Sequence, residues 1–128
     1  MLLAVCRELD IEFDEAVIPG IAFGFAGGIG NTGAVCGAVA GAAMAIALKL
    51  GRAEDMGQAL ERLGVTQELR RRFEEEMKTI SCRELTGLDL TKLEAQEMLM
   101  KSDVTQTACF PAVAAAYRIT LDLLSEGE

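Results

Sequence analysis

The feature that most constrains this chain is a run of 33 residues, positions 16–48, without a charged side chain. On length alone it exceeds the roughly 20 apolar residues that span a bilayer. Its middle, however, reads GGIGNTG (27–33), with four glycines and two polar residues. Glycine costs a helix about 1 kcal/mol per residue relative to alanine, and a loop in hydrocarbon leaves its amides unpaired. We therefore expect a glycine-rich loop followed by a buried central helix over 34–50, and no membrane partner.

The rest of the sequence has helical periodicity and no alternating strand pattern. This predicts one all-α domain over residues 1–128, a small bundle-like fold with the glycine loop before its central helix. Gly51 is expected to end the central helix, and Gly64 a following one. The expected further elements are helices at 2–9, 53–63, 66–77, 91–101 and 111–125, a short helix capped by Asp14, and a turn at 81–85.

Two of these expected helices have an apolar face at core spacing. In the 53–63 helix Met56, Leu60 and Leu63 are expected to face inward, and in the last helix Val113 and Thr120 are among the expected core positions. Pro111 is well placed as the first residue of that last helix.

Charge and composition exclude several function classes. The chain has 12 Lys and Arg against 20 Asp and Glu, a net charge of −8, so nucleic acid is not an expected partner. It has no histidine, which excludes Ser-His-Asp and Cys-His catalysis and any histidine-containing zinc or haem site.

The spacing Gly28-x-Gly30-x-x-Gly33 before a helix matches the dinucleotide-binding fingerprint. That fingerprint needs a parallel sheet, and the sequence after Gly51 predicts helices only. We therefore interpret the loop as a tight turn, in which Gly27, Gly28, Gly30 and Gly33 shape a site and let neighbouring segments approach closely.

Four cysteines remain as candidate reactive groups: Cys6, Cys36, Cys82 and Cys109. They form no CxxC pair, and no basic start precedes an apolar stretch as it would in a signal peptide. Sparse cysteines without a secretion signal are typical of a reducing compartment, so we expect a cytoplasmic protein with free thiols.

Three of these cysteines lie where a helix is expected to begin. Cys36 follows the glycine loop, Cys82 opens the short turn, and Cys109 precedes the last helix. Free amides and the positive end of the helix dipole favour a thiolate at such positions. Cys6 differs, because it falls on the apolar face of the first helix and is expected to fill the core.

Three segments then resemble the C-GCAxxG-C-C family of putative redox-active proteins. They read FAGGIGNTGAVCGAVAG (25–41), SCRELTGLDL (81–90) and CFPAVAAA (109–116). The resemblance covers most of the chain. It implies an all-helical fold and a cysteine cluster that is redox-active or metal-binding, and it names no substrate.

The chain departs from the family pattern at two places. Val35 stands where the pattern has its first glycine, and the family's first cysteine precedes the segment that resembles 2–5, whereas Cys6 follows it. Cys6 therefore does not take the role of that first cysteine. We expect either that the chain works with three cysteines or that a further cysteine lies upstream of Met1.

Three hypotheses follow for Cys36, Cys82 and Cys109, which we expect to meet in one cluster. The first is thiol–disulfide or electron-transfer chemistry, as in a thiol oxidoreductase acting on a redox partner protein, with Cys36 as the most constrained thiol. The second is a binding module that holds a soft metal ion or an iron–sulfur cluster through the same three thiolates. The third is a structural helical oligomer with packing cysteines.

The apolar run at 16–48 also bears on assembly. It holds more apolar surface than one small bundle readily covers, and large apolar patches mark interfaces. We therefore expect a homodimer built through the first helices or the helix after the glycine loop.

Overall fold

The computed structural model describes residues 1–126. Over these residues the chain forms α-helices and one π-helical turn, and no strand is present. The predicted all-α fold is confirmed. In chain order the elements are α1 (Leu2–Glu8), α2 (Val17–Phe23), α3 (Gly37–Leu50), α4 (Met56–Met77), α5 (Cys82–Thr86), α6 (Leu93–Lys101), the π turn η1 (Thr105–Cys109) and α7 (Phe110–Glu126).

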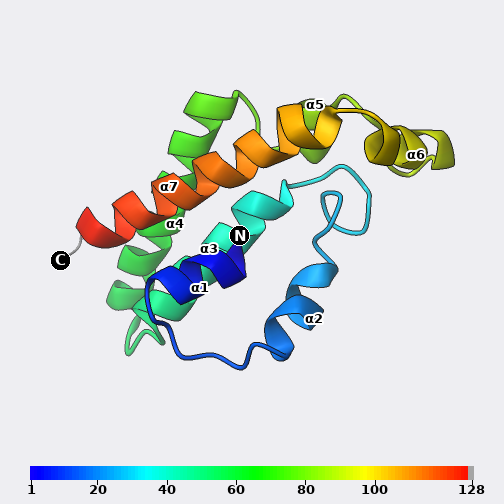
Figure 1. Cartoon of the computed structure of the whole chain (residues 1–128). Helices are drawn as coiled ribbons and strands as arrows, with labels where there is room; N and C mark the ends of the chain where they lie inside the picture. Colours follow the sequence, from blue (N-terminus) through cyan, green and yellow to red (C-terminus); the bar gives the residue numbers. More distant parts are fainter. Residues whose placement is uncertain (127–128) are drawn as a thin grey trace.

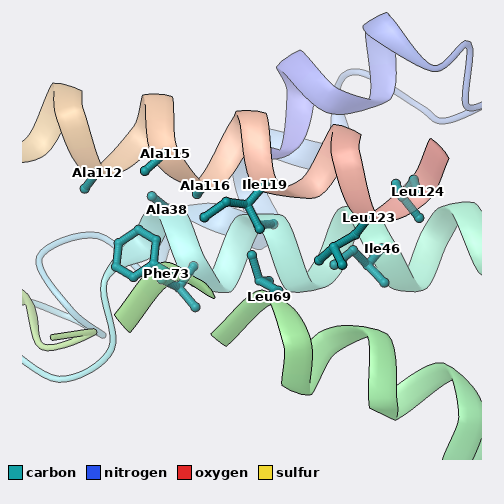
Figure 2. Packing of buried hydrophobic residues seen from close by; sticks show 12 residues of the cluster. Ala38, Ile46, Leu69, Phe73, Ala112, Ala115, Ala116, Ile119, Leu123 and Leu124 are labelled. Atoms are coloured by element: carbon teal, nitrogen blue, oxygen red, sulfur yellow. The ribbon is translucent and has the colours of Figure 1, made fainter. Parts of the chain in front are cut away.

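The main core lies between α3, α4 and α7, which pack against one another around the middle of the molecule (Figure 1). Alanines of α3 and α7 face each other, and Leu69 and Phe73 reach in from α4, both fully buried (Figure 2). Short side chains let helix axes approach closely, because the interaxial distance depends on the residues at the contact. The buried Thr120 hydroxyl donates to the Ala116 carbonyl oxygen at 2.7 Å, so the core contains no unpaired hydroxyl there.

A second, smaller core joins α1 and α2 to α3. Cys6 and Val5 of α1 are fully buried there with Ala45 of α3. A Cβ atom at Gly41 would lie 3.3 Å from the Leu2 nitrogen, which shows how closely α1 crosses α3 at that glycine. This glycine, which lies in α3 and outside the glycine loop, therefore allows the close approach of α1.

The uncharged run 16–48 is divided among α2, the glycine loop and α3. With 7 and 14 residues, these two helices fall short of the roughly 20 that a bilayer requires. The continuous helical stretch Thr105–Glu126 is, by length and composition, apolar enough to cross a membrane. Its buried side chains pack against α3 and α4, as those of a core helix do.

The prediction of two helices around Gly64 is wrong. One helix, α4, runs from Met56 to Met77 through that glycine. It begins where the Asp55 carboxylate accepts from the Gln58 N–H at 2.7 Å. Burial of the helix's second half in the main core outweighs the roughly 1 kcal/mol cost of one glycine.

The predicted inward face of the first half of α4 is also wrong, since Met56, Leu60 and Leu63 are all exposed. The helix extends past the elements that would cover them.

Val113 of α7 is 40% exposed as well, whereas Thr120 is buried as predicted. On α2 and α3, Val17, Ile21 and Leu48 are exposed, and self-association through this region stays a prediction.

Candidate functional site

A short backbone bridge joins the two segments that carry Cys36 and Cys82. Val35 and Ser81 form an antiparallel pair, and the Cys82 N–H donates to the Ala34 carbonyl oxygen at 2.8 Å. The bridge thus joins segments that are far apart in the sequence, and both Cys36 and Cys82 line the cavity described below.

Cys36 is the N-cap residue of α3, one position before the first turn in which it was expected. Its N–H donates to the Ile80 carbonyl oxygen at 2.7 Å, and its own carbonyl accepts from the Val39 and Ala40 N–H groups. Its side chain makes no capping hydrogen bond. Both backbone polar groups of Cys36 are thus hydrogen-bonded. Its sulfur makes no capping bond and lies beside the positive end of the dipole of a 14-residue helix.

The glycine loop packs bare backbone against the start of α5. At Gly28, with φ +73°, a Cβ atom would lie 2.7 Å from the Cys82 Cβ and 2.6 Å from the Ala34 nitrogen. At Gly33, with φ +74°, a Cβ would lie 2.8 Å from the Arg83 Cβ. Neither position admits a side chain, so these two glycines allow α5, and with it Cys82, to sit against the loop.

The loop also stores backbone strain. Residues 27–31 all have positive φ, and they include Ile29 and Asn31. A β-branched residue in this region is unusual and costly, and such strain persists only where the surroundings over-determine it. The Thr32 hydroxyl helps to hold the conformation by bonding to the Gly28 and Ile29 carbonyl oxygens at 2.8 and 2.7 Å.

Cys109 does not lie at a free helix start, which corrects the prediction. It is the last residue of the π turn, which runs without a break into α7, so Pro111 is not the first residue of the last helix. Proline lacks an N–H and cannot continue the ordinary helical hydrogen bonds. The widened turn precedes it, with the Phe110 N–H bonded to the Thr105 carbonyl oxygen. The π turn packs against α5, and this contact brings Cys109 to Cys82.

The three cysteines line one cavity of about 170 Å³. Each of them is partly exposed, so the cavity is open to solvent. The walls come from the glycine loop, the start of α3, α5, the end of α6 and the junction of the π turn with α7. The remaining lining residues are Gly27, Gly28, Gly37, Ala38, Leu85, Thr86, Leu90, Leu99, Ala108, Ala112 and Val113.

Two of the thiols in the cavity have a raised pKa. Burial raises the pKa of Cys82, and the charges of Cys36 and Cys109 raise it further. Burial also raises the pKa of Cys109, to which the charge of Cys36 adds. The expected preference for a thiolate is therefore wrong for Cys82 and Cys109, because loss of water around the sulfur disfavours the charged form.

Cys6 lies apart from this cavity, as predicted. Its side chain is fully buried in the second core, among Leu2, Val5 and Ala45. Burial raises its pKa. It fills space between α1 and α3 and takes no part in the cavity.

The four predicted loop glycines have different roles. Gly27 and Gly28 line the cavity. Gly33 packs against Arg83 of α5 and does not line the cavity. Gly30 lies in open space, with no atom within 4 Å of a Cβ built there. Nucleotide binding through this motif needs a parallel sheet, and residues 1–126 contain no strand. The space beside Gly28 and Gly33, where a phosphate would have to approach, is filled by residues of α5.

Sequence reasoning missed the polar neighbour Thr86 and the apolar walls. The Thr86 hydroxyl donates to the Cys82 carbonyl oxygen at 2.8 Å. Its position four residues after Cys82 in a helical turn could have indicated this contact. Leu90, Leu99 and Val113 carried no such local signal, because they come from segments that meet only in the folded chain.

The arrangement of possible ligand side chains also bears on the metal hypothesis. Within residues 1–126 no three cysteine, aspartate or glutamate side chains are grouped so that they could hold a metal ion. The described side chains therefore do not fit a soft metal ion or an iron–sulfur cluster.

Comparison with known protein families identifies a matching family model. A family model described as "Putative redox-active protein (C_GCAxxG_C_C)" matches residues 1–123. No curated protein and no solved structure shows a significant match.

Proposed function

This chain belongs to the C-GCAxxG-C-C family, which is described as "Putative redox-active protein", and from that premise we propose that it performs thiol–disulfide exchange with Cys36, Cys82 and Cys109. The observation that carries the proposal is that these three cysteines line one cavity open to solvent, whereas the fourth is buried in the core. Separate packing roles would not require the three to share one cavity.

Cys36 is the attacking group. It stands at the start of α3, where the helix dipole favours an anion, and its thiolate raises the pKa of the other two thiols. The Cys36 thiolate attacks one sulfur of a disulfide, so that a new S–S bond forms and the substrate's own S–S bond breaks. One half of the substrate leaves as a thiolate and takes up a proton.

Cys82 or Cys109 resolves the mixed disulfide. The second thiol loses its proton and attacks the Cys36 sulfur, which releases the other half of the substrate as a thiol. The protein then holds an intramolecular disulfide, and the substrate has been reduced by two electrons. A cellular thiol restores the reduced protein by the reverse exchange. Burial raises the pKa of both resolving thiols, and the part of the rise that comes from the charge of Cys36 is removed once Cys36 is in the mixed disulfide.

The test is equilibration of the whole chain with mixtures of dithiothreitol and its oxidised, uncharged cyclic form. Mass spectrometry counts the hydrogens lost, and peptide mapping locates the disulfide. We expect one reversible intramolecular disulfide that joins two of the three cavity cysteines. Cys36→Ser is expected to abolish mixed-disulfide formation with the cyclic reagent.

Cys6→Ser is the matched control, because it changes a cysteine outside the cavity. It is expected to leave the position of the redox equilibrium unchanged. The proposal is wrong if no intramolecular disulfide forms at any ratio of the two reagents, or if the disulfide that forms includes Cys6.

A further inference from the structure

The walls of the cysteine cavity carry information about the substrate. Among the residues that line it, none is charged, and the side chains other than the three thiols are alanines, leucines, a valine and one threonine. The hydroxyl of that threonine, Thr86, already donates to the Cys82 carbonyl oxygen. No side chain in the lining offers an ion pair to a substrate.

Arg83 and Glu84, the charged residues that follow Cys82 in the sequence, do not line the cavity. The Arg83 side chain is 63% exposed and lies 3.7 Å from the Asp89 carboxylate. Glu84 is exposed and is not part of the cavity wall. A charged group that entered the cavity would therefore lose part of its hydration without gaining a partner, which disfavours it relative to an uncharged group.

The volume of the cavity limits the size of the substrate group. The cavity volume is about 170 Å³, and an apolar cavity of about 150 Å³ is enough to hold benzene. The space thus accommodates about six non-hydrogen atoms, far fewer than a folded polypeptide segment or a tripeptide disulfide presents.

We propose that the substrate group of this site is a small, uncharged, apolar disulfide, which enters the cavity with its S–S bond against Cys36. This rests on the proposed thiol–disulfide exchange and adds its substrate class. The reaction is balanced by the disulfide itself: two protein thiols are oxidised to one S–S bond, and one substrate disulfide is reduced to two thiols.

The experiment compares three disulfides that share the core C–C–S–S–C–C: uncharged diethyl disulfide, cationic cystamine and anionic 3,3′-dithiodipropionate. Mixed-disulfide formation on the whole chain is timed by mass spectrometry. Each rate is divided by the rate for the same chain unfolded in urea, which cancels the intrinsic reactivity of each disulfide.

For diethyl disulfide we expect a folded-to-unfolded ratio at least about tenfold above that of either charged disulfide, because the charged ones pay for desolvation. The protein's net charge of −8 acts differently, since it attracts cystamine. A ratio for cystamine equal to or above that of diethyl disulfide would overturn the proposal, as would equal ratios for all three.

A charge placed at the cavity gives a second test. Val113 lines the cavity and is 40% exposed, so Val113→Arg is expected to fold and to shift the preference toward the anionic disulfide. Val17→Arg is the matched control, because Val17 is 46% exposed on α2 and does not line this cavity. Unchanged ratios in Val113→Arg would also overturn the proposal.

The two proposals fail in different ways. If the intramolecular disulfide forms in dithiothreitol mixtures but the three ratios are equal, thiol–disulfide exchange stands and the substrate class is wrong. If diethyl disulfide reacts selectively at Cys36 but no intramolecular disulfide follows, the substrate selectivity stands and the resolving step is wrong.

Discussion

The core between α3, α4 and α7 and the cysteine end of the molecule are built on different principles. In the core, alanines and a few large side chains such as Leu69 and Phe73 exclude solvent completely. At the cysteine end, backbone hydrogen bonds, a strained glycine loop and a π turn hold three partly exposed thiols around an open space. The contrast shows that stability and reactivity are assigned to separate regions, which can be perturbed independently.

The largest expected effect is in the core. Leu69 is fully buried between α3 and α7, so Leu69→Ala should lower the free energy of unfolding by ~3 to 5 kcal/mol through lost burial and a residual cavity. Urea unfolding followed by circular dichroism measures it. Under conditions where the variant is still folded, the thiol reactivity of Cys36 should be unchanged, and a large change would contradict the separation of the two regions.

A smaller effect is expected in the glycine loop, where two glycines form a matched pair. Gly28→Ala introduces a Cβ that meets Cys82 and Ala34, in addition to a positive φ. It should cost ~2 to 4 kcal/mol, combining backbone strain with overpacking. Gly30→Ala has the same sign of φ but open space, so only the strain of ~1 to 2 kcal/mol applies.

The same pair distinguishes the role of the loop in positioning Cys82. Gly28→Ala should alter the rate at which Cys82 is alkylated, whereas Gly30→Ala should not. Site-resolved mass spectrometry after timed alkylation of the folded variants measures both rates. Equal changes in the two variants would show that the loop does not position Cys82 through Gly28.

The smallest effect is a shift in thiol titration. The pKa values of Cys82 and Cys109 are raised above the usual 9.0, partly by the charge of Cys36. Cys36→Ser should therefore move the alkylation profiles of both to lower pH, as followed with iodoacetamide across a pH series. Cys6→Ser is the control and should move neither, and unmoved profiles in Cys36→Ser would contradict the shared cavity.

The raised pKa values of Cys82 and Cys109 also predict the direction in which the free energy of unfolding changes with pH. A thiol that ionises less readily in the folded than in the unfolded chain stabilises the fold fully below the unfolded pKa, and this stabilisation is lost as the pH rises through the folded value. The free energy of unfolding should thus fall as the pH rises above 9.0. Urea titrations at pH 7 and at pH 10 measure the difference.

Local sequence was sufficient for much of this protein, because its signals act over a few residues. The end of α3 at Gly51, which has a positive φ, and the short turn that begins at Ser81 lie where the sequence predicts them. The glycine loop could be predicted because few other residues adopt positive φ. The role of Cys6 followed from its place on an apolar helix face.

Only the tertiary structure decided which segments meet. The continuation of α4 through Gly64 depends on burial against α3 and α7, and this burial outweighs local propensity. The raised pKa values of Cys82 and Cys109 depend on burial in the region where the π turn packs against α5. The cavity itself is bounded by residues as distant as Gly27 and Val113. Sequence spacing indicates which thiols are reactive candidates, but desolvation and the shape of a cavity arise only when distant segments pack together.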